Sequence, residues 1–282
     1  MLLIILVIAI VFVLCVTMYF HNQLEKLKHR EMLYKRIKTI NYKIPLVIHQ
    51  SWTNWESIDE RIKEIIQQNR NICNDWDYKF YSDEDQMEYI KKNFDPKVLK
   101  AFLKINPKNG AMRTDLWRYC VMYNEGGLYL DIKSKIHTNP TSLMEPADEC
   151  ILFACDDGRF CGERDRQNKP FFSYEQWCLL YAPNHPYMKA AVETCVNNIE
   201  KNWIPPFKNK KKQVLYVTGP DAYSLAIHKV DGHTDLTKIK RKSFFTSQLF
   251  KYSVVNHTKV LYKDINRHYS NPDEPLYIEE DG

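Results

Sequence analysis

The sequence has no internal repeat, no low-complexity tract and no CxxC pair of cysteines. The lack of a CxxC pair means that the sequence has no obvious zinc site. No basic helix of the nucleic-acid-binding type is present either, and the formal net charge of +5 is spread along the chain. We therefore do not expect DNA or RNA as a partner.

Eight cysteines are present, and one of them, Cys15, lies in an apolar stretch at the start of the chain, so an odd number remains. Cys150, Cys155 and Cys161 are close enough along the chain for a local disulfide in an oxidising compartment. Buried free thiols are the simpler interpretation. The cysteines therefore do not identify the compartment.

The N-terminal stretch of residues 2–20 is apolar and carries no charge over nineteen residues. A helix of that length is long enough to cross a bilayer. The stretch is too long for the core of a signal peptide, and no small-residue cleavage site follows it. We therefore predict a retained transmembrane helix and a single-pass membrane protein.

Positive charge follows this stretch and does not precede it. The residues concerned are Lys26, Lys28, Arg30, Lys35, Arg36 and Lys38. By the positive-inside rule they favour the cytosol, which would place the rest of the chain there too. One Asn-X-Thr triplet, residues 256–258, is glycosylated only in a lumenal domain, but a single triplet is expected by chance.

Composition predicts an anchor at residues 1–20, a polar, Lys-rich, helical stem at residues 21–43 and a globular domain at residues 44–282. A chain of 282 residues is long enough for one large α/β core, and 44% hydrophobic content argues against disorder. Short apolar runs alternate with polar helical stretches, which is the order of an α/β fold. The predicted strands are VIHQSW, YKFYS, LYLDI, ILFAC and QVLYVT, at residues 47–52, 78–82, 128–132, 151–155 and 213–218.

The most informative stretch is residues 109–136, which predicts a helix, a glycine stop and a buried strand. Asp115 and Arg118 are three residues apart and so point the same way from the helix. The glycines at residues 126–127 end the helix, because glycine tolerates the left-handed backbone that a helix stop commonly requires. The apolar run that follows suits a strand covered on both faces and ends at Asp131. Ligands of open α/β sheets bind beyond the carboxyl ends of the strands, so Asp131 is a site candidate.

Taken alone, each of these residues has a plainer interpretation. An Asp and an Arg three apart on a helix most often form a surface ion pair that contributes little to stability. An aspartate after a strand, such as Asp131, often only begins a turn. The choice between these interpretations and a binding site depends on the wider sequence pattern.

The sequences RTDLWRY and GGLYLD, at residues 113–119 and 126–131, resemble the signature of glycosyltransferases that carry a sugar-binding DXD motif. This family includes the initiating α-1,6-mannosyltransferase of yeast and, more remotely, the clostridial glucosylating toxins. Weaker matches occur in the family's order at residues 44–52, 184–193 and 217–227. The resemblance implies a GT-A-like, Rossmann-related nucleotide-sugar-binding domain.

The resemblance also implies which residues bind the nucleotide sugar donor. Asp115 and Arg118 would contact its sugar and phosphate, and a guanidinium suits phosphate because its planar fork holds two oxygens. Trp52 closes the first strand, where the family has an aromatic residue that stacks on the base; a core tryptophan is an equal alternative. His49 is predicted to be a core histidine. The implied donor-binding set is Trp52, Asp115, Arg118, Asp131, Thr218 and Gly219.

The motif departs from the family pattern at its second aspartate, where this chain has Lys133. In the family that aspartate binds the divalent cation, and Mg²⁺ and Mn²⁺ prefer oxygen ligands, which an ammonium cannot supply. Three alternatives stay open. Lys133 takes over part of the cation's role at the leaving diphosphate, or catalysis has been lost, or Mn²⁺ or Mg²⁺ is held by a set drawn from Asp131, Asp156, Asp157 and His268.

Together these features predict a membrane-anchored, retaining hexosyltransferase with Asp131, Lys133 and Glu175 as catalytic residues. Glu175 would orient an acceptor hydroxyl, although a solvated helix start is an equal interpretation of it. The donor is a nucleotide diphosphate sugar, and the acceptor is a glycan, a glycolipid or a protein. By analogy with secretory-pathway enzymes the catalytic domain lies in the Golgi or ER lumen, against the preference of the positive flank. The alternative is a non-catalytic, membrane-tethered protein that binds nucleotide sugars or glycans.

Overall fold

The computed structural model describes residues 2–154, 173–232, 241–245, 250–251 and 274–278. The chain divides into two compact units, Met1–Asn41 and Tyr42–Gly282.

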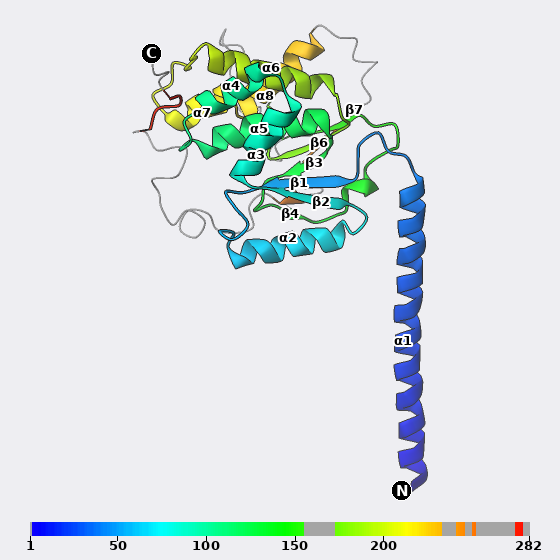
Figure 1. The fold of residues 1–282 in the computed structure, drawn as a ribbon. Coiled ribbons are helices and arrows are strands. Elements are labelled where there is room, and N and C mark those ends of the chain that lie inside the picture. Colours follow the sequence, from blue (N-terminus) through cyan, green and yellow to red (C-terminus); the bar gives the residue numbers. More distant parts are fainter. Residues whose placement is uncertain (1, 155–172, 233–240, 246–249, 252–273, 279–282) are drawn as a thin grey trace. The chain divides into compact units, whose positions relative to one another are not determined.

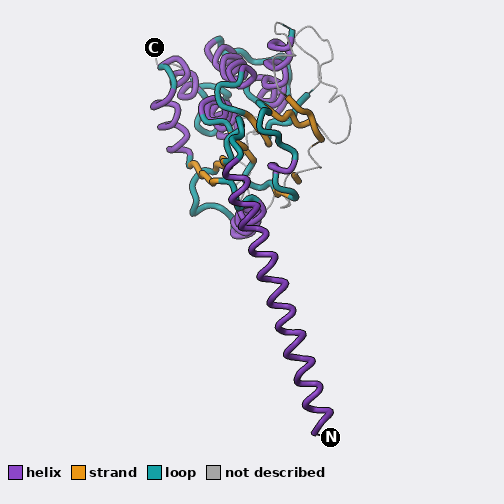
Figure 2. The backbone as a smooth tube through the Cα atoms, turned by 90° about the vertical axis from the view of Figure 1, so that its right-hand side faces the viewer, coloured by secondary structure: helices purple, strands orange, loops and turns teal. Residues whose placement is uncertain are grey.

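The first unit consists mainly of the helix α1 (Leu2–Thr39), which continues without interruption from the predicted anchor into the predicted stem (Figures 1 and 2). The helical pattern predicted for residues 21–43 is observed as far as Thr39, and the division into anchor and stem stays a prediction. None of the helices in the described part of the chain is both long and apolar enough to cross a membrane. The predicted anchor at residues 2–20 is therefore not confirmed.

The second unit is built on a mixed six-stranded sheet with the order β2-β1-β3-β6-β5-β7. β6 runs antiparallel to both of its neighbours, β3 and β5, and the other neighbouring pairs are parallel. A second, two-stranded sheet pairs β4 with β8. The strands are β1 (Val47–Ser51), β2 (Asp77–Tyr81), β3 (Gly127–Leu130), β4 (Lys135–Ile136), β5 (Cys150–Ala154), β6 (Cys178–Tyr181), β7 (Arg241–Phe245) and β8 (Phe250–Lys251).

Helices cover the two faces of the large sheet unequally, with α2 on one side and α3 to α8 on the other (Figure 1). Alternate residues of β3 serve the two layers: Tyr129 packs into the core beneath α4 to α8, whereas Leu128 and Leu130 pack into the core of the opposite face. The helices are α2 (Glu60–Ile72), α3 (Asp83–Asn93), α4 (Pro96–Lys104), α5 (Gly110–Asn124), α6 (Pro186–Glu200), α7 (Lys210–Val217) and α8 (Pro220–Asp231), with a 3₁₀ turn at Pro140–Ser142.

Several helices begin at residues whose side chains cap them. Asp59, Ser82 and Asp95 each accept a hydrogen bond from a main-chain N–H of the first turn of α2, α3 and α4. At α3 the Asp85 side chain also accepts from the main-chain N–H of Ser82, which completes a capping box. The local sequence therefore sets where these helices start.

Four of the five predicted strands are confirmed as β1, β2, β3 and β5. The predicted strand QVLYVT is wrong, because this stretch lies in α7 and at its carboxyl cap, Thr218. Asn209 caps this helix by accepting from Lys212, and Val214 and Val217, three residues apart, both reach the core. A short apolar run cannot be assigned to strand or helix by its pattern alone.

The turn between α5 and β3 requires both of its glycines. Gly126 and Gly127 have φ angles of +66° and +89°, in the region that favours glycine. A Cβ on Gly127 would lie 2.6 Å from both the Cγ1 and the main-chain oxygen of Val47. The predicted glycine stop is confirmed, and the close approach of β1 adds a second reason for it.

Substitution Gly127→Ala is expected to lower the free energy of unfolding by at least ~2 kcal/mol, because backbone strain and the clash with Val47 act together. Urea unfolding followed by circular dichroism measures this loss. Gly110→Ala is the matched control, since nothing lies within 4 Å of a Cβ there and the residue begins α5. An unchanged unfolding midpoint for Gly127→Ala would contradict the argument.

Candidate active site

Asp131 directly follows β3, at the edge where the parallel strands β1, β2 and β3 end. Because β6 runs antiparallel to β3, its amino end and the segment before it, residues 173–177, lie at the same edge. The main-chain N–H of Asp131 donates to the carbonyl oxygen of Trp177 at 2.8 Å. This edge of the sheet is thus formed by strands running in opposite directions, and Asp131 links them.

Asp115 and Arg118 lie on α5, which is packed on all sides. Only 4% of Asp115 and 6% of Arg118 are exposed. The predicted common direction of the two side chains is confirmed, because Arg118 Nη2 lies 3.3 Å from Asp115 Oδ1. The alternative of a surface ion pair is wrong for this pair.

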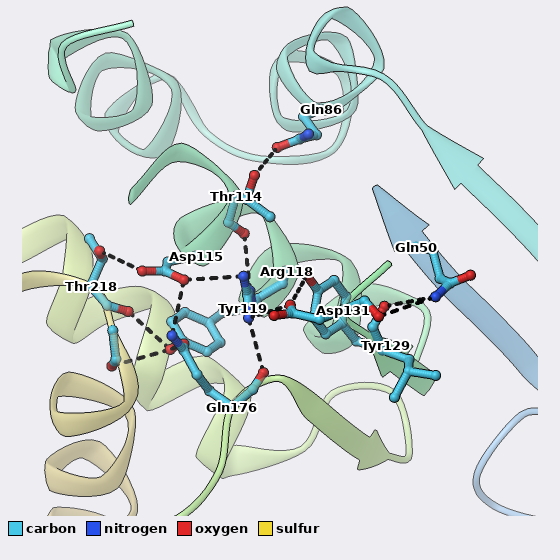
Figure 3. A network of polar contacts seen from close by, with 12 residues as sticks. Gln50, Gln86, Thr114, Asp115, Arg118, Tyr119, Tyr129, Asp131, Gln176 and Thr218 are labelled. Carbon is cyan, nitrogen blue, oxygen red and sulfur yellow. Dashed lines mark hydrogen bonds and ion pairs between the residues drawn. The ribbon is translucent and has the colours of Figure 1, made fainter. Parts of the chain in front are cut away.

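The Arg118 guanidinium lies between two carboxylates at the centre of the site (Figure 3). Its Nη1 lies 3.3 Å from Asp131 Oδ1 and donates to the carbonyl oxygen of Gln176 at 3.1 Å, and its Cζ lies 4.5 Å from the centre of the Tyr129 ring. Burial lowers the pKa of Arg118, but its contacts with Tyr129, Asp131 and Asp115 outweigh burial and raise it. Arg118 is therefore a permanent buried cation that joins α5, the end of β3 and the segment before β6.

Asp131 is the more accessible of the two carboxylates, with 21% of its side chain exposed. Its Oδ1 accepts a hydrogen bond from the Tyr129 hydroxyl at 2.9 Å and faces Arg118. Within the described ranges, no side chain or main-chain group donates to its Oδ2. The carboxylate is thus held in place by one oxygen and presents the other to a ligand.

Asp115 has protein partners at both of its oxygens. Oδ2 accepts from the Thr218 hydroxyl at 3.0 Å, and Oδ1 accepts from the Gln176 side-chain amide at 3.1 Å in addition to its ion pair with Arg118. Burial raises the pKa of Asp115 to about 6, although Arg118 and Thr218 act to lower it. Thr218, predicted from its Thr-Gly-Pro segment, is therefore brought into the site as a partner of Asp115.

The sequence did not point to Gln176 or Tyr119, although both belong to this network (Figure 3). The Tyr119 hydroxyl contacts the side-chain oxygen of Gln176 and lies 3.0 Å and 3.4 Å from the carbonyl oxygens of Thr218 and Gly219. Tyr119 is the last residue of RTDLWRY, and Gln176 is next to the predicted Glu175. Their positions next to predicted residues were the only signal available.

Lys133 lies in a tight turn with Asp131, because the carbonyl oxygen of Asp131 accepts from the N–H of Ser134 at 2.9 Å. The pKa of Lys133 is lowered, chiefly by burial and also by the nearby charge of Arg118, although the charge of Asp131 acts to raise it. The turn is supported from β1 by Gln50, whose side-chain nitrogen lies 3.3 Å and 3.4 Å from the carbonyl oxygens of Leu130 and Asp131. Lys133 and the accessible carboxylate of Asp131 thus belong to one hydrogen-bonded turn.

The other predicted residues lie around this edge. Trp52 follows β1, and its main-chain N–H donates to the carbonyl oxygen of Tyr81 at 3.2 Å. Its half-buried side chain packs beside the core under α2. Glu175 lies in a segment that is not helical, and its main-chain N–H donates to the carbonyl oxygen of Phe153 at 2.8 Å. The alternative of a helix start is therefore wrong. Gly219 is the amino-terminal cap of α8.

His49 is confirmed as a core histidine. It is fully buried, and its ring nitrogens contact the Tyr81 hydroxyl and the Gly126 carbonyl oxygen, both at 3.1 Å. Burial lowers its pKa to about 4, although Glu125 raises it. Because both nitrogens of this neutral imidazole have protein partners, its role is structural.

The predicted metal ligands are only partly described. Asp156, Asp157 and His268 lie outside the described residues, although β5, which precedes the two aspartates, ends at the same edge as β3. In the described part of the chain, no group of three or more His, Cys, Asp or Glu side chains is placed to hold a metal ion. Asp131 offers one free oxygen, which suits a cation ligand, whereas Lys133 does not.

The Asp115–Arg118–Asp131 arrangement thus lies at the carboxyl edge of the strands, where open α/β sheets bind their ligands. Residues 59–146 match the family model described as "Glycosyltransferase sugar-binding region containing DXD motif". This segment contains Asp115, Arg118, Asp131 and Lys133. The predicted resemblance is confirmed for this segment, which is similar to the sugar-binding region of DXD-motif glycosyltransferases.

Two yeast proteins are similar over a longer stretch of 177 residues, or 63% of this chain. Inositol phosphoceramide mannosyltransferase 2 of Schizosaccharomyces pombe is 25% identical, and the match covers 44% of its length. Mannosyl phosphorylinositol ceramide synthase SUR1 of Saccharomyces cerevisiae is 35% identical, and the match covers 40% of its length. The chain thus matches less than half the length of these relatives.

Among solved structures, the PaToxG glycosyltransferase is similar with a TM-score of 0.49 and 16% sequence identity. The match covers 74% of this chain and 80% of that protein.

The raised pKa of Asp115 predicts a pH-dependent stability. In the unfolded chain this carboxyl loses its proton near pH 3.8 and in the folded protein near pH 6. The proton bound to the folded state therefore contributes stability that is fully present below pH 3.8 and lost as the pH rises through about 6. The free energy of unfolding of the wild type minus that of Asp115→Asn should fall across this window.

Urea unfolding of both proteins at several pH values between about 4 and 7 measures this difference. Asp95→Asn controls for the loss of one negative charge, since it is exposed and asparagine also caps a helix. A difference that stays constant or rises with pH would show that burial does not dominate the environment of Asp115.

Proposed function

We propose that this protein transfers a hexose from a nucleotide diphosphate sugar to a hydroxyl acceptor with retention of the anomeric configuration. The observation that carries the proposal is the Arg118 cation held between Asp115 and Asp131 at the carboxyl edge of β3, within the matched sugar-binding region. An enzyme of this class needs hydroxyl-binding carboxylates and fixed positive charge at one place. The described edge contains both kinds of group.

In the proposed reaction the bond from the anomeric carbon to the diphosphate oxygen breaks, and the acceptor oxygen bonds to the same face of the sugar. The acceptor's proton leaves with the diphosphate. Asp131 accepts a hydrogen bond from a ribose or sugar hydroxyl through Oδ2, because its Oδ1 is already occupied. Arg118 fixes that carboxylate and adds positive charge behind it.

We propose that Lys133 supplies positive charge toward the leaving diphosphate. It is in the same turn as Asp131, at the position where the family motif has a second aspartate. Mn²⁺ or Mg²⁺ held by Asp131 together with residues outside the described part is the competing arrangement. Either would stabilise the negative charge that gathers on the leaving group.

The remaining predicted residues have peripheral roles in this proposal. Trp52 would stack on the base from the end of β1, and Glu175 would orient the acceptor hydroxyl from the segment before β6. Gly219, at the start of α8, would lie beside the donor. These roles remain predictions.

The relatives suggest the substrate class. Both are named for mannosyl transfer to inositol phosphoceramide, so mannose and a glycolipid acceptor are our first choice for this chain. A location at a membrane would suit such an acceptor. Attachment through residues 2–20, as a single-pass protein of the Golgi or ER, remains a prediction that extraction with alkaline carbonate tests.

A non-catalytic nucleotide-sugar-binding protein is the second candidate. The observation that favours it is Lys133 in place of the second aspartate. Such a protein would bind a donor without releasing nucleotide diphosphate above background. The two candidates therefore differ in one measurable product.

We expect the full chain, purified in detergent, to hydrolyse at least one donor from a panel of GDP-mannose and UDP-hexoses. Asp131→Asn should lower kcat/KM for that donor by about 100-fold, because it removes a carboxylate that holds a hydroxyl in the transition state. Asp95→Asn, the same change at an exposed cap, should leave turnover unchanged. Donor binding without turnover in the wild type would favour the binding protein, and full activity in folded Asp131→Asn would remove Asp131 from the site.

If Lys133 replaces the metal, turnover should survive EDTA, and Lys133→Ala should lower it by about 100-fold. Assays with added Mn²⁺ and with EDTA measure this. Lys135→Ala, two residues further on and half-exposed in β4, is the control. Loss of turnover in EDTA would instead support a metal held by Asp131 and residues beyond the described part.

A further inference from the structure

Gln176 has a distinctive set of contacts for a residue outside every motif of the sequence. Its side-chain nitrogen donates to Asp115 Oδ1 at 3.1 Å, its side-chain oxygen accepts from the Tyr119 hydroxyl, and its carbonyl oxygen accepts from Arg118 at 3.1 Å. The amide nitrogen and the main chain of Gln176 therefore face the charged pair Asp115 and Arg118, and the amide oxygen faces Tyr119 (Figure 3).

The surroundings select one orientation of this amide. If the amide were reversed, its oxygen would face the carboxylate of Asp115, and two acceptors would oppose each other. The Tyr119 hydroxyl has one proton and lies near three acceptors, namely Gln176 and the carbonyl oxygens of Thr218 and Gly219. The carboxylate thus decides the orientation, and the amide in turn restrains the carboxylate.

The backbone that carries Gln176 is anchored to the sheet. The residues on both sides of it make main-chain hydrogen bonds to strands or strand ends. The N–H of Glu175 donates to the carbonyl oxygen of Phe153, and the carbonyl oxygen of Trp177 accepts from the N–H of Asp131. Asp115, by contrast, comes from α5, and Thr218 comes from the junction of α7 and α8. Gln176 is therefore the group through which the sheet edge restrains a carboxylate carried by a helix.

We infer that Gln176 is a positioning residue that holds Asp115 in the orientation in which it faces Arg118, and through Arg118 sets the position of Asp131. The order of contacts is Gln176 to Asp115, Asp115 to Arg118 and Arg118 to Asp131. Asp131 alone of these presents a free oxygen at the edge. Its role toward substrate rests on the proposed function, whereas the restraint on Asp115 does not.

Two substitutions test this inference. Gln176→Leu removes both hydrogen bonds of the amide, and Gln176→Glu keeps the shape but sets a second carboxyl against Asp115. In both, Asp115 loses a donor that stabilises its charged form, so its titration should move upward by about one pH unit. The carboxyl ¹³C signal of Asp115, assigned by its absence in Asp115→Asn, reports this shift without any substrate.

Gln86→Leu is the matched control. Gln86 is a buried glutamine that also contacts α5, through the Thr114 hydroxyl at 3.2 Å, but it does not touch Asp115 (Figure 3). It should lower the melting temperature as much as Gln176→Leu while leaving the titration of Asp115 in place. An unchanged titration in both Gln176 variants, or an equal shift in Gln86→Leu, would overturn the inference.

Measurements of donor turnover distinguish failure of this inference from failure of the proposed function. With the best donor, the Gln176 variants should lose about 10- to 100-fold in kcat with little change in KM, and the acid limb of the pH profile should move upward. Absence of turnover in the wild type would refute the proposed function while the NMR titration still decides the inference. Wild-type kcat and an unmoved acid limb in the variants would overturn the inference.

Discussion

The buried guanidinium of Arg118 is the constraint on which the rest of the site depends. A charge in this position is destabilising by several kcal/mol unless every face of it is matched, because it has been removed from water. Asp115, Asp131 and the Gln176 carbonyl oxygen provide that match from α5, the end of β3 and the segment before β6. The three elements are therefore joined at this point by one ionic cluster.

This requirement explains the form of the chain around the cluster. Arg118 is on a helix and Asp131 ends the next strand, so the chain must reverse direction within a few residues to bring them together. Gly126 and Gly127 make that reversal with positive φ angles, and β1 packs so closely on the second glycine that no side chain fits. A feature that looks like a simple helix stop is thus a condition for forming the ion pair.

The two carboxylates of the cluster have different environments and hence different capacities. Asp115 is enclosed and bonded at both oxygens, which suits a group that holds others in place. Asp131 is partly exposed and held by one oxygen only, which suits a group that meets a ligand. The two carboxylates are thus bound to the same arginine but differ in what else they can contact.

Much of this arrangement could be predicted from the sequence, and the failures have identifiable causes. The helix, the glycine stop and the strand ending at Asp131 follow from local patterns, and these patterns also place Asp115 beside Arg118. Thr218 was predicted from the wider resemblance and not as a partner of Asp115, and Gln176 was not predicted at all. Both come from segments far along the chain, and no local rule says which side chain will reach the carboxylate. Local pattern also fails at α7, where the apolar run at residues 213–218 predicts a strand. Only the packing of this segment on the core identifies it as a helix.

The substitution of Lys133 for the second motif aspartate can be judged by the charge it leaves at this edge. With an aspartate there, three carboxylates would face one arginine, and an added cation would be needed for balance. With lysine, the described part of this edge has Asp115 and Asp131 as carboxylates and Arg118 and Lys133 as cations, so these four charges balance when Asp115 is ionised. When Asp115 is protonated the same edge becomes net positive, which favours a diphosphate. In the proposed reaction this charge would act on the leaving diphosphate, at a position where an aspartate would instead act as a metal ligand.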